Sequence, residues 1–297
     1  RAASSMALVL ALGCTQERVF VCTTNEECVD GDVLGFCQPA HVCSFPDDGC
    51  PSLQRYGSRA PDALAEQCVA GDLVSALAAR WAFDEGTGKA VRDTSGHGVD
   101  AEIDRGAESV SGVWGSALFF DGSGTPVTAP GDSTRFGDAS FSGAAWVRAG
   151  AAQVPQSRII GRGFDVTGPG GYIFLNFGDG NPFTEFRDSL SAAWDVSADG
   201  VNLGDEAWHH IGFVLDRSAS VITIFVDGVR EESRAIDSTG VFGDPNTQDE
   251  FLIGAQNGNP ATAMKGDIDE VWIYTRALTD ADMAALYQGP GLARPKP

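Results

Sequence analysis

The sequence predicts an all-β protein in which two antiparallel sheets pack face to face, preceded by a small disulfide-rich module. From residue 78 onward, short runs of β-branched and aromatic residues are separated by turns rich in glycine, aspartate and serine. The 37 glycines and 6 tryptophans suit many turns and large side chains on sheet faces. All seven cysteines lie before residue 69, which sets the first part of the chain apart.

The clearest local pattern is a three-strand meander over residues 208–232. Trp208–Leu215 and Val221–Val226 read as strands, and Asp227-Gly228 then turns the chain into a third strand, Val229–Glu232. Asp-Gly between two such runs predicts a type I′ turn, because both of its central residues need a positive φ. The alternating apolar residues need a second sheet to cover them.

The remaining elements follow in order from residue 80. Further strands are expected at Arg80–Phe83, Ala117–Phe120, Ser140–Arg148, Arg158–Gly161, Tyr172–Phe177, Leu190–Val196, Glu250–Gly254 and Gly266–Tyr274. Thr279 is expected to cap a helix over Asp280–Tyr287, and a short helix is expected within residues 60–77. The predicted organisation is a signal peptide (1–14), a cysteine-rich module (15–70), a linker (71–79), the sandwich (80–287) and a tail (288–297).

The first residues indicate export. Met6–Gly13 is a short apolar run, too short to span a bilayer but suited to the core of a signal peptide. With Cys14 it resembles a bacterial lipobox, in which that cysteine is lipidated, although Ala11 and Leu12 stand in the reverse of the usual order. The alternative is that Cys14 belongs to the following module. We expect an exported protein, anchored to the outer membrane by lipid or extracellular.

Six cysteines remain after Cys14, and a dense even set in an exported segment predicts three disulfides. They are Cys22, Cys28, Cys37, Cys43, Cys50 and Cys68. A zinc site is the rival interpretation, but the segment has no C-x-x-C pair and only His41 nearby. The pattern C-T-T-N-E-E-C, followed by G-F-C and H-V-C, resembles cysteine-rich repeats of bacterial surface lipoproteins, which implies surface display.

The formal net charge of −21 bears on possible partners. Nucleic-acid binders carry basic patches, so the balance argues against a nucleic-acid partner. It suits cations or neutral sugars, and it is equally typical of a solvated acidic surface.

The motifs of the large domain resemble a known family. W-A-F-D-E-G-T-G, D-T-S-G-H-G, G-S-A-L-F-F-D-G, W-H-H-I-G-F-V-L-D and G-D-I-D-E-V-W-I-Y occur in the order of laminin-G-like domains, which belong to the concanavalin A-like lectin and glucanase superfamily. The resemblance covers about residues 80–287. It implies a two-sheet antiparallel jelly roll, commonly with one bound calcium ion, that serves in binding or adhesion.

A jelly roll places its first and last strands side by side, which suggests where calcium would bind. The expected ligands are Asp121, Asp269 and Asp93, with a carbonyl from Gly122. Alternation along the last strand puts Asp267 and Asp269 on one face, opposite Ile268, Glu270 and Trp272. The alternative is that these aspartates cap turns.

A carbohydrate site is expected in the middle of the domain, where aromatic rings occur beside amide and charged groups. The candidates are Tyr172, Asn176, Trp194, Asn181 and Arg187. The alternative is that most of the rings are core side chains.

The sequence shows no catalytic carboxylate set. Glucanases of this superfamily carry a pattern resembling E-x-D-x-E on one strand, whereas Asp267–Val271 supplies only two carboxylates on one face. In His209-His210, adjacent residues face opposite sides of a strand, so the pair is expected to be structural.

We therefore expect a non-catalytic cell-surface module that binds a glycan or an extracellular protein. Its only expected membrane contact is the lipid anchor. A purely structural or adhesive role and a glycoside hydrolase-like enzyme are the alternatives.

Overall fold

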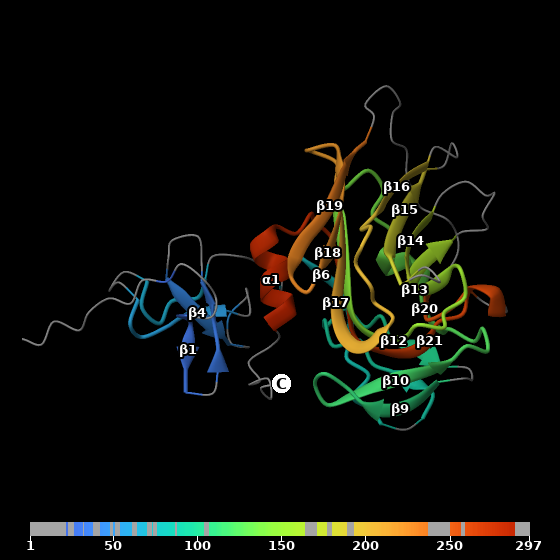
Figure 1. Cartoon of the computed structure of the whole chain (residues 1–297), viewed down its shortest axis with the longest axis horizontal. Helices are drawn as coiled ribbons and strands as arrows, with labels where there is room; N and C mark the ends of the chain where they lie inside the picture. Colours follow the sequence, from blue (N-terminus) through green and yellow to red (C-terminus); the bar gives the residue numbers. More distant parts are fainter. Residues whose placement is uncertain are drawn as a thin grey trace, which may run out of the picture.

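The computed structural model describes residues 22, 27–31, 33–37, 42–47, 50, 54–60, 64–69, 73, 76–86, 88–103, 107–163, 171–176, 180–188, 193–236, 250–256 and 259–288. The predicted signal peptide, Cys14 and the tail after residue 288 lie outside these ranges. Two large antiparallel sheets dominate the chain (Figure 1). No helix in the described part of the chain has the length and apolar character that spanning a bilayer requires.

The first sheet has eight strands, and its two ends come from distant parts of the sequence. Its order is β19 (Val229–Ala235), β18 (Val221–Val226), β17 (Asp205–Asp216), β12 (Phe141–Gly150), β21 (Lys265–Tyr274), β10 (Ser116–Asp121) and β9 (Ala107–Ser111), with β6 (Leu77–Trp81) also paired to β21. The first and last strands of the domain are therefore neighbours, as the family resemblance implied.

The second sheet also has eight strands. Its order is β16 (Ala193–Ser197), β15 (Pro182–Arg187), β14 (Gly171–Asn176), β13 (Ser157–Gly163), β20 (Phe251–Ile253), β11 (Val127–Ala129), β8 (Ala101–Ile103) and β7 (Ala90–Val91). Two short 3-10 helices, η2 (Gly131–Thr134) and η3 (Pro260–Thr262), lie in its connections. β15 falls in a stretch for which the sequence predicted no strand.

The space between the sheets is filled by aromatic rings from both. Phe141 and Phe213 of the first sheet contact Tyr172 and Phe186 of the second, with ring centroids 4.9–6.1 Å apart. Each of these rings is almost fully buried, and burial of such large apolar surfaces is the main stabilising contribution to folding. The predicted two-sheet sandwich is confirmed.

The predicted meander is also confirmed. β17, β18 and β19 pair in sequence, and Asp227 and Gly228 adopt φ values of 51° and 78°, as a type I′ turn requires. The two histidines face opposite sides, as expected. His210 is fully buried beside Trp146, whereas His209 bonds the carboxylates of Asp205 and Asp227.

β21 contains a β-bulge that changes which of its residues share a face. Asp269 pairs with Trp146 of β12, and Trp272 pairs with Ala144. Two residues of β21 therefore lie opposite the single residue Ala145 of β12, and one of them, Glu270, takes a φ of 49°. Trp272 consequently lies on the same side as Asp269, in the cluster outside the sandwich. The prediction that Trp272 lies opposite Asp269 was wrong, because it assumed uninterrupted alternation.

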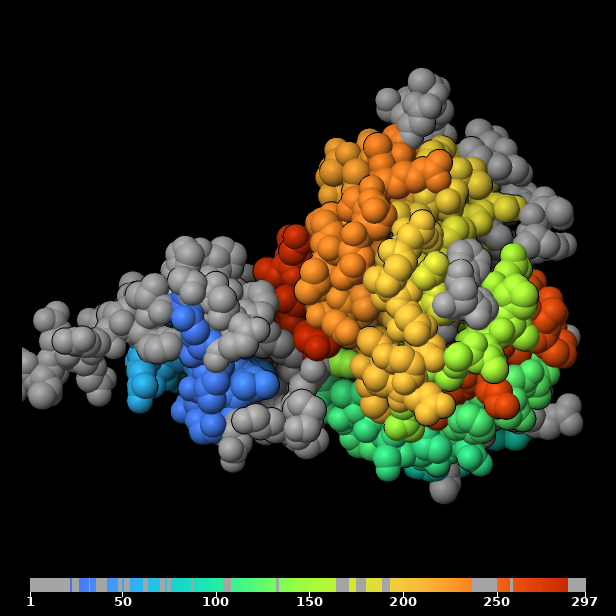
Figure 2. Space-filling view, in the orientation of Figure 1, coloured from blue at the N-terminus to red at the C-terminus, as the bar shows by residue number. Residues whose placement is uncertain are grey.

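A second apolar cluster covers part of the outer face of the first sheet. Trp146 and Trp272 lie beneath Trp114, from the turn before β10, and beneath the helix α1 (Asp280–Gln288), whose Tyr287 stacks on Trp146 at 5.5 Å. Figure 2 shows the red atoms of α1 lying against the orange atoms of β18 and β19. Thr279 caps this helix as predicted, since its hydroxyl accepts the Asp282 N–H while the Asp282 carboxylate accepts the Thr279 N–H.

The N-terminal region consists of short strands joined by disulfides. It contains β1 (Val29–Asp30), β2 (Val33–Leu34), β3 (Phe36–Cys37), β4 (Cys43–Pro46) and β5 (Gln54–Tyr56). Cys28–Cys43 and Cys50–Cys68 are disulfides, and Cys22 is also disulfide-bonded. The sulfurs of Cys22, Cys28 and Cys43 lie together but are oxidised, so this cluster is not a thiolate zinc site.

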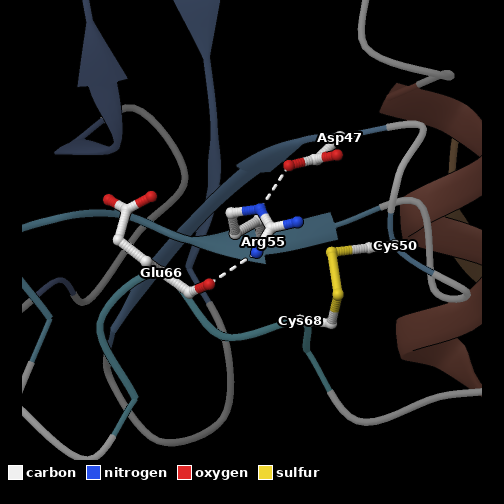
Figure 3. Close-up of a disulfide and its surroundings, with 5 residues drawn as sticks. All are labelled: Asp47, Cys50, Arg55, Glu66 and Cys68. Atoms are coloured by element: carbon white, nitrogen blue, oxygen red, sulfur yellow. Dashed lines mark hydrogen bonds and ion pairs between the residues drawn. A yellow bond between two sulfur atoms is a disulfide. The ribbon is translucent and has the colours of Figure 1, made fainter.

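Arg55 ties this region together (Figure 3). Its side chain pairs with Asp47 and donates to the Glu66 carbonyl, next to the Cys50–Cys68 bridge. The described residues within 60–77 do not form the expected helix. Residues 64–66 form a turn, and the backbone of Cys68 pairs with that of Arg55 in an isolated antiparallel β-bridge. The disulfide fixes this extended conformation.

Candidate functional site

The aromatic residues predicted to stack on a sugar lie inside the sandwich. Tyr172 is 1% exposed, and its hydroxyl donates to the Thr134 carbonyl at 3.2 Å. Trp194 is 9% exposed and belongs to the main core. Neither ring offers a free face to solvent, so the prediction that they form a sugar-stacking surface was wrong. The rings face inward because the alternation of β14 and β16 points these positions at the first sheet.

The polar residues predicted beside those rings do not surround a common cavity. Arg187 pairs with Glu185 at 2.6 Å, two residues away on β15. Asn181 is partly buried just before β15. Asn176 lies at the end of β14, and its side chain falls outside the described residues. Without the rings, nothing in the described geometry joins these residues into one site.

The residues predicted to bind calcium lie at three separate places. Asp121 is exposed at the end of β10, opposite Lys265, and its carboxylate accepts the Ser123 N–H across the turn at Gly122. Asp269 lies four residues further along β21, roughly 13 Å from that point. Asp93 accepts the backbone N–H groups of Arg80, Ser95 and Val99. The predicted convergence is not observed, since Asp93 and Asp121 cap local turns.

Asp269 differs from the other predicted ligands because part of its carboxylate is unsatisfied. Its Oδ2 accepts the N–H groups of Val113 and Trp114, at 2.7 and 3.3 Å, and so holds the turn before β10. Its Oδ1 is buried and has no hydrogen-bond partner among the described residues. Burial, reinforced by the nearby Glu270 carboxylate, raises the pKa of Asp269 to about 8. This oxygen therefore favours a proton or a cation.

The β21 bulge also brings two charged residues together. Glu270 is buried and accepts two hydrogen bonds from Arg80, each 2.9 Å long. Burial raises the pKa of Glu270, and the paired guanidinium opposes that shift. Asp84 accepts the Ser116 N–H at 2.8 Å nearby. On this edge, β21 pairs with β10 through residues 265–268 and with β6 through residues 271–274. The contacts of Asp269, Glu270 and Asp84 lie between these two pairings.

A row of four side chains crosses the uncovered part of the first sheet's outer face. Trp208 of β17 lies opposite Arg148 of β12, which lies opposite Asp267 of β21, which lies opposite Phe119 of β10. We call Trp208, Arg148, Asp267 and Phe119 the outer ladder. Their flanking residues Val147 and Ile268 point into the main core, so the ladder faces outward.

The charged pair at the centre of the ladder is held in a defined orientation. The Arg148 guanidinium lies over the Trp208 ring, 4.9 Å from its centroid, and its Nε–H donates to Asp267 Oδ2 at 2.7 Å. The Arg148 side chain remains 37% exposed, whereas that of Asp267 is 10% exposed. Trp208 and Asp267 therefore hold Arg148 from its two neighbouring strands, while the Arg148 side chain remains partly exposed to solvent.

Three of the four ladder residues line a groove of about 660 Å³, and Trp208 does not. The groove is lined by Phe119, Arg148, Asp267, Lys265, Gly266, Glu206 and the segment 149–153. Gln153 braces that segment, since its Nε2 donates to the carbonyls of Gly150 and Lys265 and its Oε1 accepts the Lys265 N–H. The groove is thus preformed and combines an aromatic ring, an arginine and carboxylates.

Sequence reasoning did not find this groove. Its residues come from four strands that are distant in sequence and from the segment 151–153, and of them only Asp267 lies in a pattern that suggested a site. The only available signal was the alternation in A-A-W-V-R and G-D-I-D, which places Arg148 and Asp267 outward, but alternation alone does not reveal that their strands are adjacent.

Three solved structures show the same fold. The binding domain of Paraclostridial Mosquitocidal Protein 1 is 16% identical, with a TM-score of 0.61, and the match covers 73% of this chain and 52% of that one. Domain 4 of AbnA, a GH43 extracellular arabinanase from Geobacillus stearothermophilus solved in complex with arabinotriose, is 19% identical, with a TM-score of 0.52 and coverage of 71% and 98%. The ligand-binding domain of botulinum neurotoxin serotype D, in complex with N-acetylneuraminic acid, is 12% identical, with a TM-score of 0.56 and coverage of 73% and 51%.

The chain spans about half the length of the toxin binding domains that it matches. Among curated proteins, no sequence is similar enough to count as a relative. A family model described as the concanavalin A-like lectin/glucanases superfamily matches residues 121–284, more than half of the 297 residues. The chain therefore belongs to the concanavalin A-like lectin/glucanases superfamily.

Proposed function

We propose that this protein is a non-catalytic surface module that binds a glycan in the groove beside the outer ladder. The observation that carries the proposal is the groove itself: it is preformed, open to solvent, and lined by an aromatic ring and by hydrogen-bonding side chains. Domains of the same fold were solved with arabinotriose and with N-acetylneuraminic acid, which supports a glycan as the ligand class.

The carboxylates near the groove favour binding over hydrolysis. A glycosidase needs one carboxylic acid with a raised pKa at the substrate and a second carboxylate facing it. Asp269 has the raised pKa, but it is fully buried beneath the Trp114 turn. Asp267 and Glu206 line the groove, but Asp267 is engaged by Arg148 and Glu206 is exposed to solvent.

A glycan array tests the proposal, using the full chain and a variant in which the groove is filled. Ala152 is exposed on the groove segment, so Ala152→Trp is expected to abolish binding without disturbing the fold. Ala193→Trp is the matched control, because Ala193 is exposed on the second sheet near Trp194. Loss of binding in the control but not in Ala152→Trp would contradict the proposal.

We further propose that the domain binds a structural calcium ion through Asp269, rather than through Asp121 or Asp93. The buried, unsatisfied Oδ1 supports this, because calcium needs hard oxygen ligands and removes the cost of a buried charge. Calcium is expected to raise the melting temperature of the wild type and of Asp121→Asn, but not that of Asp269→Asn. Equal calcium stabilisation of all three proteins would assign the ion elsewhere.

We also propose that the protein is exported and held at the membrane surface through lipidated Cys14. The two described disulfides support an oxidising compartment. Cys14 itself lies outside the described residues. Mass spectrometry of the protein from the native membrane tests this proposal, with a lipid on Cys14 as the expected result. An unmodified Cys14 in the exported protein would contradict it.

A further inference from the structure

The ladder arginine has hydrogen-bonding capacity that the protein does not use. Within the described ranges, the only hydrogen bond of the Arg148 side chain is the one from Nε to Asp267. Its two terminal nitrogens therefore have no protein acceptor there, although the residue lines the groove and is about one third exposed. A guanidinium fork of this kind matches the two oxygens of a planar carboxylate.

Arg148 is also preorganised for such a contact. The guanidinium carbon lies over the Trp208 ring, and Asp267 accepts the hydrogen bond from Nε. The ligand therefore does not have to immobilise a long, flexible side chain, which is a major part of the entropic cost of binding. Arg187 provides a contrast on the second sheet, since it pairs with Glu185 on its own strand and lines no part of this groove.

A second cation stands next to the ladder. Lys265 is exposed, lies two residues before Asp267 on β21 and lines the same groove. Its hydrogen bonds to Gln153 use backbone atoms, and in the described part of the chain its side chain has no ion-pair partner. Arg148 and Lys265 thus supply two positive charges, of which Asp267 neutralises one.

The acidic surroundings limit how much negative charge a ligand can carry. Glu206 lines the groove, Asp121 lies opposite Lys265, and the whole chain carries a net charge of −21. A dense polyanion such as a nucleic acid would be repelled by this field. A glycan with isolated carboxylates separated by neutral sugar atoms suits both the local cations and the overall charge.

Phe119 completes the arrangement. It is partly exposed, and it lies two strands from Arg148, or roughly 10 Å. A sugar ring can pack on Phe119 while the carboxylate of a neighbouring sugar meets Arg148. We propose that the groove binds acidic oligosaccharides, with Arg148 as the carboxylate receptor and Phe119 as the stacking surface. This inference rests on the proposed glycan-binding function and specifies its ligand class.

The test uses pairs of ligands that differ only in the charge of the carboxyl group. Oligogalacturonate, oligomannuronate and hyaluronan oligosaccharides, and their methyl-esterified forms, are titrated calorimetrically into the full chain. We expect at least one acid form to bind, about tenfold or more tightly than its ester, with an affinity that falls as salt is added. Arg148→Gln is expected to remove this preference, and Arg148→Lys to restore only part of it because it lacks the fork.

Arg187→Gln is the matched control and is expected to bind like the wild type. Equal binding of acid and ester, with Ala152→Trp still blocking both, would overturn the carboxylate inference and leave the glycan function standing. An acid preference that survives Arg148→Gln would also overturn it. Failure of every carboxylated oligosaccharide to bind, while neutral glycans bind on the array, rejects this inference alone. Failure of all glycans rejects both proposals.

Discussion

The outer face of the first sheet is divided into a covered half and an open half that are built on the same strands. β12, β17 and β21 carry Trp146, His210 and Trp272 in the covered half, sealed by Trp114 and α1. Arg148, Trp208 and Asp267 of the outer ladder lie two residues after Trp146 on β12, two before His210 on β17 and two before Asp269 on β21. The sheet itself does not distinguish the halves. The halves differ in how far the cover extends, which leaves the charged and aromatic residues of the outer ladder at the surface.

The largest expected difference between the halves is in stability. Trp146→Ala removes a side chain packed against Trp114 and Tyr287, and should lower the free energy of unfolding by about 3–5 kcal/mol. Trp208→Ala should cost less, about 1–2 kcal/mol, because Trp208 is only partly buried where it contacts Arg148 and the edge of the covered cluster. Urea denaturation measures both. Equal losses would mean that the halves are equally important to the fold.

Breaking the buried ion pair between Glu270 and Arg80 should also cost more stability than breaking the exposed pair between Asp267 and Arg148. Glu270→Gln breaks the buried pair with Arg80 and should cost about 3 kcal/mol, since it leaves a poorly solvated guanidinium without its counter-charge. Asp267→Asn breaks the more exposed pair with Arg148 and should cost about 1 kcal/mol or less. Chemical denaturation at neutral pH compares them. A larger loss for Asp267→Asn would make the ladder pair structural rather than functional.

A further expected effect is the pH dependence of stability contributed by Asp269. Its pKa is about 8 in the folded protein, against an ordinary value of 3.8. The folded state therefore favours the protonated carboxyl, and its stabilising contribution is complete below pH about 4 and is lost as the pH rises toward 8. Melting temperatures in the presence of a chelator measure this loss, and Asp269→Asn should show a smaller decline over that range. An identical decline in the variant would assign the titration to another group.

Local sequence patterns were sufficient to predict the strands that end in clear turns. Val221–Val226, the Asp227-Gly228 turn and the Thr279 cap agree with the structure because neighbouring residues determine them. The faces of β21 were partly misassigned, because a bulge at Glu270 depends on tertiary contacts with Arg80.

The site was harder to predict for a similar reason. Tyr172 and Trp194 are residue types expected in a sugar site, but both are buried. The sequence of a strand does not show which of the strand's two faces packs against the other sheet. The outer ladder depends on the adjacency of four strands, which follows from topology alone. The aspartates predicted to bind calcium do not lie together, because Asp121 and Asp269 are on neighbouring strands but four residues apart along them.

Binding at the open half of the first sheet is tested most directly by hydrogen exchange of the full chain, with and without the carboxylated oligosaccharide that binds most tightly in the titrations. Binding in the groove predicts slower exchange in residues 148–153 and 265–267, which line it, and little change in β14–β16 of the second sheet. Protection confined to β14–β16, with none in the groove segments, would contradict the claim that the open half of the first sheet is the binding surface.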